Sequence, residues 1–336
     1  MRSVTDPGAS RYPRISPVTG ERPRPFWSVM IPVYNCAEYL RTTLGSVLPQ
    51  LTADHGAQIE VVDDCSTKDD PAAVVRQCGG GRVTYFRQPK NVGPQANFTT
   101  CIERARGEWV HILHADDLVA DGFYAAIEKA ARANPTVGAA FCRTVTIDAT
   151  GARLSLSELE AEEAGIQHDL IGRLAVDNRI MFPSIAVKRQ TYESVGGFHP
   201  ELFHSADWDM WRRVALAVPV WYDPAPLAMY RLHEQSDTSS LMRTGANIAD
   251  ARHAIEIARG YLPPDRRDDL TRRARRYHAG YALEVAEEMV ERRAWPSAFA
   301  QVREALRCSI SPAVVSRALR LSGRASYRLL AAPERR

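Results

Sequence analysis

The chain has 336 residues, of which 45% are hydrophobic and 25% charged, so it is long enough for one large or two ordinary soluble domains. A formal net charge of +3 is too small to indicate nucleic-acid binding, and no hydrophobic run approaches the roughly 20 residues of a membrane-spanning helix. The six Cys and nine His form no CxxC pair or His-rich tract, which argues against structural zinc. No signal peptide is recognisable, so we expect reduced thiols in a cytoplasmic protein.

Residues 1–25 are rich in Pro, Arg and Ser and show no hydrophobic periodicity, which predicts a flexible N-terminal arm. Beyond them, short apolar runs alternate with segments of helical period. One helix carries clear end signals, with Asp70 as N-cap, Pro71 at the first helical position and Gly79 at its stop. The expected strands lie at 29–33, 59–64, 83–88, 108–114 and 138–148, and the helices at 36–50, 70–79, 93–107 and 121–134.

This alternation predicts an α/β fold, with a mostly parallel, Rossmann-like sheet flanked by helices. The pattern loosens after about residue 150. Segments 168–179 and 205–218 read as helices, and 220–233 reads as an extended segment in which Pro224 and Pro226 suggest a sheet edge. Four further helices are expected at the C-terminal end, at 245–260, 266–293, 296–308 and 312–330. We therefore divide the chain into the arm (1–25), an α/β domain (26–240, with halves 26–120 and 121–240) and a helical region (241–336).

Polar side chains follow three of the expected strands at the point where each strand ends. They are Tyr34 and Asn35, then Asp63 and Asp64, then His114, Asp116 and Asp117. In an open parallel sheet these ends meet at one edge, where ligands bind. Adjacent carboxylates raise each other's pKa unless a cation compensates, and Mg²⁺ or Mn²⁺ prefers such oxygen ligands together with substrate phosphates. Asp117 could instead cap the helix that begins near residue 121.

The phosphate-binding loops of common nucleotide-binding folds are missing. No GxGxxG follows the first strand and no GxxxxGK[ST] occurs, while Gly79–Gly81 fall between a helix and a strand and read as a turn. Rossmann dehydrogenases and P-loop hydrolases are therefore disfavoured. A bound metal would have to hold any phosphate groups instead.

Four segments together resemble glycosyltransferase family 2, whose members have the GT-A fold. They are SVMIPVYNCAEYLRTTLGSVLPQ, IEVVDDCSTKDD, NVGPQANFTTCIERARGEWVHILHADDLVADGFY and GGFHPELFHSADWDMWRRVA, and they cover roughly residues 26–235 in the family's order. The resemblance implies an inverting enzyme that transfers a sugar from a nucleoside diphosphate to an acceptor hydroxyl. It also implies a Mn²⁺ or Mg²⁺ cofactor and, as the commonest donor of the family, a UDP-sugar.

The resemblance assigns the donor-binding positions one by one. The positions that line the nucleobase and ribose, or belong to the segment that closes over the nucleotide, are Pro32, Tyr34, Asn35, Asp63, Asp64, Asn91, Gly93 and Asn97. HADD occupies the position of the family's DXD motif, so Asp116 matches the metal ligand and Asp117 the acid that often follows it. His233 sits where many relatives place a metal- or diphosphate-contacting His. His114 replaces the first Asp of the motif; it can still hydrogen-bond the ribose, but it removes one carboxylate from the metal.

The same comparison makes Asp207 the catalytic base, with Ala206 where a Glu usually precedes it. A helix N-cap is the alternative for Asp207, since a helix begins there. Trp208 could stack on an acceptor sugar, whereas Trp211, at helical spacing, is expected in the core. Phe182 and Ser184 fall where relatives line the acceptor site, and core packing explains them equally well.

Several alternatives remain at the level of function. A nucleotidyltransferase making nucleotide sugars, or a non-catalytic nucleotide-sugar binding module, could share much of this pattern. The acceptor could be a polysaccharide, a glycolipid or other lipid-linked molecule, or a specialised metabolite. The basic, amphipathic C-terminal helices would either pack on protein, including a second subunit, or lie on the inner face of the membrane as a peripheral contact.

Overall fold

The structure is a computed structural model that describes residues 11–19, 23–233 and 237–330. It consists of two compact units, which are described separately. The first unit contains residues up to 171, 179–201 and 209–232, and the second contains 172–178, 202–208 and the chain from residue 233 on.

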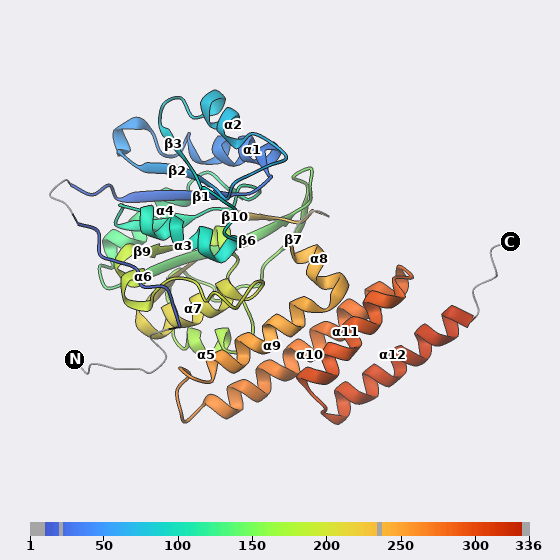
Figure 1. Ribbon diagram of the computed structural model, residues 1–336. Coiled ribbons are helices and arrows are strands. Elements are labelled where there is room, and N and C mark those ends of the chain that lie inside the picture. The colour runs from blue at the N-terminus through green and yellow to red at the C-terminus, as the bar shows by residue number, and fades with distance from the viewer. Residues whose placement is uncertain (1–10, 20–22, 234–236, 331–336) are drawn as a thin grey trace. The chain divides into compact units, whose positions relative to one another are not determined.

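A ten-stranded mixed sheet forms the centre of the first unit (Figure 1). Its main path runs in the order β3-β2-β1-β4-β9-β6-β10-β5, and β7 and β8 pair with β6 and β10. The pairs from β3 to β4 are parallel, as the sequence predicts, whereas β9 is antiparallel to both of its neighbours. The strands are β1 (Trp27–Val33), β2 (Gln58–Asp63), β3 (Val83–Arg87), β4 (Trp109–Ile112), β5 (Leu118–Val119), β6 (Ala139–Ile147), β7 (Arg153–Leu156), β8 (Gly165–Ile166), β9 (Ile185–Lys188) and β10 (Val220–Arg231).

Strand β1 is buried along its whole length, and its alternate residues enter one core with helices α1, α2 and α4. Every second side chain of the strand points to the same face of the sheet, and Leu40, Leu44 and Val47 lie on one face of α1. These two apolar faces pack together in the core. The helices of the α/β region are α1 (Ala37–Val47), α2 (Pro71–Cys78), α3 (Pro94–Arg104), α4 (Phe123–Ala133), α5 (Leu170–Leu174), α6 (Arg189–Val195) and α7 (Ala206–Ala217), with 3₁₀ turns at Ala53–His55 and Phe182–Ser184. The end signals of α2 are confirmed: the Asp70 side chain accepts a hydrogen bond from the Ala73 N–H.

The described part of the N-terminal arm packs on the first unit, so the prediction of a flexible arm is wrong for residues 11–19. Ile15 is 2% exposed, and the Gly197 N–H donates to the Pro13 carbonyl at 2.7 Å. The Tyr12 ring lies under the Arg213 guanidinium, 4.0 Å from its carbon, and meets His199 edge to face. Hydrophobic periodicity detects helices and strands, but it cannot detect a few single anchoring side chains.

Strand β10 lies between β6 and β5, which corrects the expectation that its prolines mark a sheet edge. The register with β6 shifts between Asp223 and Pro226 and again between Pro226 and Ala228. The missing proline N–H groups therefore fall where the ladder is already interrupted. The helix expected over 168–179 is also shorter than predicted, because α5 covers only Leu170–Leu174.

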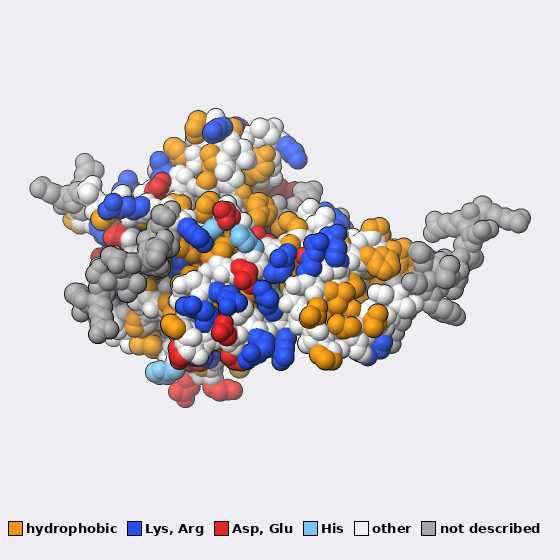
Figure 2. Space-filling model, turned by 60° about the horizontal axis from the view of Figure 1, so that its bottom comes forward, with side chains coloured by type: hydrophobic (Ala, Val, Ile, Leu, Met, Phe, Trp, Pro, Cys, Tyr) orange, Lys and Arg blue, Asp and Glu red, His pale blue; other side chains and the backbone are white. Residues whose placement is uncertain are grey.

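Helices build the second unit, at the bounds expected from the sequence to within two residues, with one further helix ahead of them. They are α8 (Asp237–Thr244), α9 (Ala246–Ala258), α10 (Arg267–Glu291), α11 (Trp295–Cys308) and α12 (Pro312–Leu330). Val314, Ala318 and Leu321 of α12 enter a core with α10 and α11, while Ile310 and Leu319 are 80% and 69% exposed. Figure 2 shows hydrophobic side chains gathered close to basic ones on the face it presents. No helix in the described ranges is long and apolar enough to cross a membrane.

Candidate active site

The loop after β1 is fixed to the loop after β2 by the side chain of Asn35. Its Oδ1 accepts hydrogen bonds from the N–H groups of Thr67 and Lys68, at 2.8 and 2.9 Å. Asn35 has a positive φ of 51°, which Asn tolerates better than most residues. Tyr34 beside it is 49% exposed, so its ring is available to a ligand.

Pro32 ends the parallel pairing of β1 with β4. The register of these strands stops at Met30 and Ile112, and the Leu113 N–H donates to the Met30 carbonyl. Residues 30 and 32 face the same neighbouring strand, so the N–H that Pro32 lacks would point past the end of β4. A proline is therefore accommodated in a central strand, at the point where the sheet opens toward the candidate site.

Asp63 at the end of β2 is fully buried, and other groups of the protein saturate its carboxylate. Oδ1 accepts from the N–H and hydroxyl of Ser66 at 2.9 and 2.5 Å, and Oδ2 accepts from the Tyr85 hydroxyl at 2.7 Å and from Arg87 Nη1 at 2.6 Å. The structure thus gives Asp63 a role in holding the β2 and β3 loops.

Asp64 and the three positions of the nucleotide loop form a second network. Asp64 accepts from the N–H groups of Val92 and Gly93, at 2.7 and 3.0 Å, and burial raises the pKa of its carboxyl in spite of these bonds. Gly93 needs its positive φ of 84° at this turn. Asn91 Nδ2 donates to the Asp64 carbonyl, and Asn97 is buried with its Nδ2 on the Val62 carbonyl.

The turn that follows β4 contains His114, Asp116 and Asp117. Their potential ligand atoms all lie within 4.8 Å of one another. Asp117 is 1% exposed; its Oδ1 accepts from the Arg231 N–H at 2.9 Å, while its Oδ2 has no hydrogen-bond partner among the described residues. Burial, and then the charge of Asp116, raise the pKa of the Asp117 carboxyl well above its usual range. Asp117 does not cap helix α4, whose N-cap is Gly122.

Sequence reasoning missed Arg231, which fixes this acidic turn to the end of β10. Arg231 is 4% exposed, and its Nε donates to the Asp116 carbonyl at 2.7 Å. Its Nη1 lies 3.0 and 3.1 Å from the carbonyl oxygens of Asp148 and Ala149. The sequence shows Arg231 only as a charged residue at the end of an extended segment, because its partners lie about 80 to 115 positions away.

The imidazole of His114 lies between aromatic rings. It stacks on Phe98 with the ring centroids 5.0 Å apart and meets Phe182 at 4.3 Å. Burial lowers the pKa of His114, so the ring is neutral at physiological pH. Phe182 itself is 6% exposed.

The residues of the acidic turn fit a divalent cation. A buried carboxylate oxygen without a partner is costly, and a cation would satisfy it. Asp116 also lies close enough to the start of α1 that its charge raises the pKa of the Cys36 thiol, after the larger effect of burial. The acidic turn and the β1 loop therefore share one edge of the sheet.

Asp207 belongs to the second unit, in the first turn of α7. Its Oδ2 accepts from Asn178 Nδ2 at 3.0 Å and its Oδ1 from the Trp208 N–H at 2.6 Å. Burial raises the pKa of this carboxyl to about 6, in spite of both hydrogen bonds. The helix begins one residue earlier, at Ala206, so Asp207 lies inside the helix and is not its N-cap. His233 lies in the same unit and is half-buried.

Trp208 offers no open face to an acceptor, contrary to expectation. It is 2% exposed, its indole N–H donates to the Leu174 carbonyl at 2.5 Å, and its ring packs on His278. Trp211 is equally buried, as expected. Ser184 is fully buried, and its hydroxyl donates to the Met181 carbonyl.

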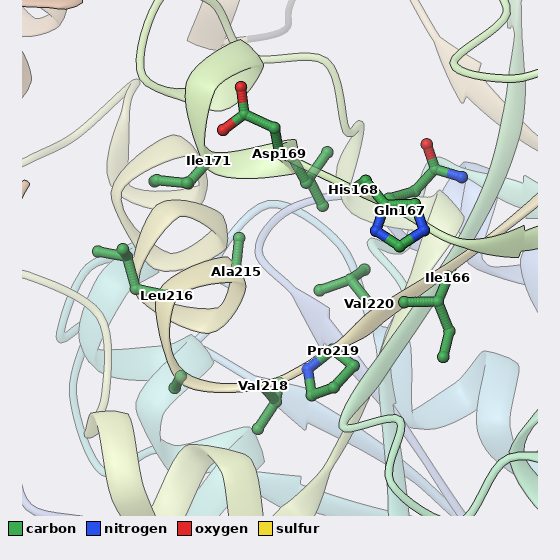
Figure 3. A pocket seen from close by; sticks show the side chains of 12 residues that line it. Ile166, Gln167, His168, Asp169, Ile171, Ala215, Leu216, Val218, Pro219 and Val220 are labelled. Atoms are coloured by element: carbon green, nitrogen blue, oxygen red, sulfur yellow. The ribbon is translucent and has the colours of Figure 1, made fainter. Parts of the chain in front are cut away.

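A pocket of about 420 Å³ lies at the opposite edge of the sheet (Figure 3). Residues 166–171 and 215–220 line it, and Val220 begins β10, whereas Arg231 at the other end of that strand holds the acidic turn. Its lining is mainly apolar, with Gln167, His168 and Asp169 as the polar members. This pocket is therefore separate from the candidate site.

Known proteins resemble the chain in both sequence and structure. The model of the family described as "Glycosyl transferase family 2" matches residues 28–192. An "uncharacterized protein" of Mycobacterium tuberculosis is 28% identical over 245 residues, 69% of this chain and 75% of its own length. An "uncharacterized glycosyltransferase" of Rickettsia typhi is 25% identical over 228 residues, 65% of this chain and 67% of its own length.

Solved structures share the fold. S. aureus TarS 1-349 in complex with UDP-GlcNAc gives a TM-score of 0.63 at 18% identity and covers 90% of this chain and 91% of its own. The mannosyltransferase PcManGT from Pyrobaculum calidifontis, in complex with GDP-Man and Mn²⁺, gives a TM-score of 0.57 at 21% identity. The match covers 93% of this chain and 82% of the mannosyltransferase chain. Residues 28–192 therefore form a domain of glycosyltransferase family 2, and the chain is a glycosyltransferase of the GT-A fold.

Proposed function

We propose that this enzyme transfers a sugar from a nucleoside-diphosphate sugar to an acceptor hydroxyl, with inversion at the anomeric carbon. The observation that carries the proposal is the Oδ2 of buried Asp117, which has no hydrogen-bond partner in the part of the chain that the structure describes. It lies beside Asp116, at the sheet edge where β1, β2 and β4 end. A cation shared with Asp116 would satisfy this buried carboxylate oxygen, and a nucleotide diphosphate is the anion that such a cation would hold.

We assign the cation to Asp116 and Asp117, with His233 as a further contact. When bound, Mn²⁺ or Mg²⁺ would stabilise the negative charge that develops on the departing diphosphate. Arg231 positions the two carboxylates, because its main chain holds Asp117 and its side chain holds the carbonyl of Asp116.

The loops after β1 and β2 would receive the nucleoside. Tyr34 supplies an exposed ring for the base, and Asn35, Asp63 and Asp64 keep the surrounding loops in place. The positions that complete this face are Pro32, Asn91, Gly93, Asn97 and, toward the ribose, His114. We favour a UDP-sugar as donor, and a GDP-sugar is its main competitor, since neighbours of the same fold were solved with UDP-GlcNAc and with GDP-Man.

Asp207 would accept the proton of the attacking acceptor hydroxyl. Its pKa of about 6 leaves the carboxylate ionised at neutral pH and makes it a stronger base than an ordinary Asp. Because Trp208 and Ser184 are buried, we propose that they support the acceptor region from within the protein and do not contact the acceptor. Phe182 packs against the ring of His114. The acceptor would be a growing polysaccharide, a glycolipid or a specialised metabolite, in the cytoplasm or at the inner face of the membrane.

Methanol can serve as a test acceptor while the natural one is unknown. The purified enzyme would be incubated with Mn²⁺, methanol and one α-linked UDP- or GDP-sugar at a time, and the methyl glycoside identified by proton NMR. A methyl β-glycoside supports inversion, and a methyl α-glycoside contradicts it. Release of pyrophosphate from a nucleoside triphosphate and a sugar phosphate would instead indicate a nucleotidyltransferase. Donor binding without any turnover would indicate a non-catalytic module.

A further inference from the structure

His114 and Asp117 face each other across a short gap. The Nδ1 atom of His114 lies 3.9 Å from Asp117 Oδ2, the oxygen that has no hydrogen-bond partner. This separation is too long for a hydrogen bond, which needs about 2.7–3.2 Å between nitrogen and oxygen. The Nε2 atom of His114 is also buried without a partner in the described structure. Two side chains of the same turn thus carry buried polar atoms that no described residue of the protein satisfies.

The aromatic neighbours of His114 fix the direction of its lone pair. Phe98 stacks on the imidazole with only 17° between the planes, and Phe182 covers it with a tilt of 39°. The lone pair of a neutral imidazole nitrogen lies in the plane of the ring, so stacking leaves the ring edges open. The Nδ1 edge is the one that faces the Asp117 carboxylate. The ring is therefore oriented before any ligand arrives.

The gap is narrow enough for His114 and Asp117 to share a cation. Bonds from a divalent metal to imidazole nitrogen and to carboxylate oxygen are each about 2.0–2.2 Å, so two such ligand atoms lie at most about 4.0–4.4 Å apart. The observed 3.9 Å falls below this limit. Asp116 supplies a further carboxylate, and one ligand atom from each of the three residues lies within 4.8 Å of the other two.

We propose that His114 is a direct nitrogen ligand of the cation, through Nδ1, and that it biases the site toward Mn²⁺ or Co²⁺ and against Mg²⁺. The proposal rests on the proposed function, because it concerns the same cation. Imidazole is a softer ligand than carboxylate and suits later transition ions, whereas Mg²⁺ prefers oxygen donors alone. On this proposal, His114 in place of the first Asp of the DXD motif does not remove the cation from the site. It changes which ion the site prefers.

Pulsed electron paramagnetic resonance of the full chain loaded with Mn²⁺ alone tests the ligand directly. A coordinated imidazole nitrogen gives a ¹⁴N modulation of the Mn²⁺ echo, and a purely oxygen-coordinated ion does not. We expect this modulation in the wild type and in His233→Gln, and its loss in the double variant His114→Asp/His233→Gln. The variants are compared in the His233→Gln background because His233 is the other His assigned to the cation. A wild type or a His233→Gln chain without ¹⁴N modulation, or modulation that persists in the double variant, overturns the proposal.

Ion preference is the second readout. Competition of Mg²⁺ against bound Mn²⁺ should give a Mn²⁺-to-Mg²⁺ affinity ratio that falls on the order of tenfold or more in His114→Asp. An unchanged ratio contradicts the proposal even if the variant folds well. The wild-type spectrum needs no variant, so a His114→Asp chain that fails to fold does not prevent the test. Methanolysis is measured separately: turnover without ¹⁴N modulation refutes only the ligand assignment, and modulation without turnover refutes only the proposed function.

Discussion

Replacing Asp207 with Asn separates a catalytic base from a structural carboxylate. The amide keeps the size of the side chain and one oxygen to accept the Trp208 N–H. The Asn178 amide can rotate so that its oxygen faces the new NH₂ group. The substitution therefore removes the proton acceptor with little change in packing. We expect turnover to fall on the order of 10²–10⁴-fold.

The same substitution should stabilise the protein at high pH. The pKa of Asp207 is raised from 3.8 to about 6, which corresponds to roughly 3 kcal/mol at about 1.36 kcal/mol per pKa unit. Solvent at this half-buried position screens part of that, so about 1–2 kcal/mol is a realistic expectation. Because the folded state holds the proton more tightly, wild-type stability declines as the pH rises from about 4 through 6. Asn cannot ionise, so the variant lacks this decline.

Two assays check these expectations. Urea unfolding at pH 8 should show Asp207→Asn to be more stable than the wild type, and the two should converge near pH 4. In methanolysis, wild-type turnover should fall with unit slope below about pH 6, and the variant should lack that limb.

Asp250→Asn is the matched control. Asp250 accepts hydrogen bonds from the N–H groups of Phe203 and Ser205, ahead of the same helix. Its replacement should cost about 1 kcal/mol of stability and keep turnover within tenfold of the wild type. Near-wild-type turnover of Asp207→Asn, or a wild-type profile that is flat down to pH 5, would refute the reasoning.

Four further outcomes are expected. Arg231→Met should lower the free energy of unfolding by about 3 kcal/mol or more in urea, because it leaves several carbonyl oxygens without their donor; a loss below 1 kcal/mol would contradict the role assigned to it. Ile15→Ala should cost about 2–4 kcal/mol and Arg14→Ala, at an exposed neighbour, less than 0.5, and equal effects would contradict the packing of the arm. Asp63→Asn should lower the melting temperature, since an amide cannot accept all four donors, and an unchanged melting temperature would argue against its loop-holding role. EDTA should abolish methanolysis and the stabilisation of the protein by UDP, and added Mn²⁺ should restore both; full activity in EDTA would exclude the cation.

The sequence predicted the parallel half of the sheet because its signals there are local. Each of the strands from β1 to β4 is a short apolar run, and helices with readable ends separate them. Asp70 shows why such signals are reliable: its cap bond reaches only three residues along the chain. The four long C-terminal helices were predictable for the same reason, since their hydrophobic period continues for several turns.

The parts that could not be predicted depend on contacts between distant residues. Arg231 reads as an ordinary charged residue until folding places it beside the acidic turn. Trp208 and Trp211 lie three positions apart, on one side of a helix. The hydrophobic pattern of the sequence could not show that both are buried. The arm has no hydrophobic periodicity, yet Tyr12 and Ile15 anchor it. The partner of Tyr12, Arg213, lies about 200 positions away in the sequence. A period reports which face of an element is apolar, but it does not identify what covers that face.

The acids at the sheet edge divide into two kinds, although the sequence presents them alike. Asp63 and Asp64 accept hydrogen bonds from the protein on both of their oxygens, so they build the loops that would receive the nucleoside. Asp117 is as deeply buried, yet one of its oxygens has no donor in the described ranges, and the turn places His114 across from it. Burial without hydrogen-bond partners is unfavourable, and a folded chain tolerates it mainly where function requires it. The unsatisfied oxygen of Asp117, together with His114 and Asp116 beside it, therefore supports the proposed cation position more strongly than the number of carboxylates in the motif does.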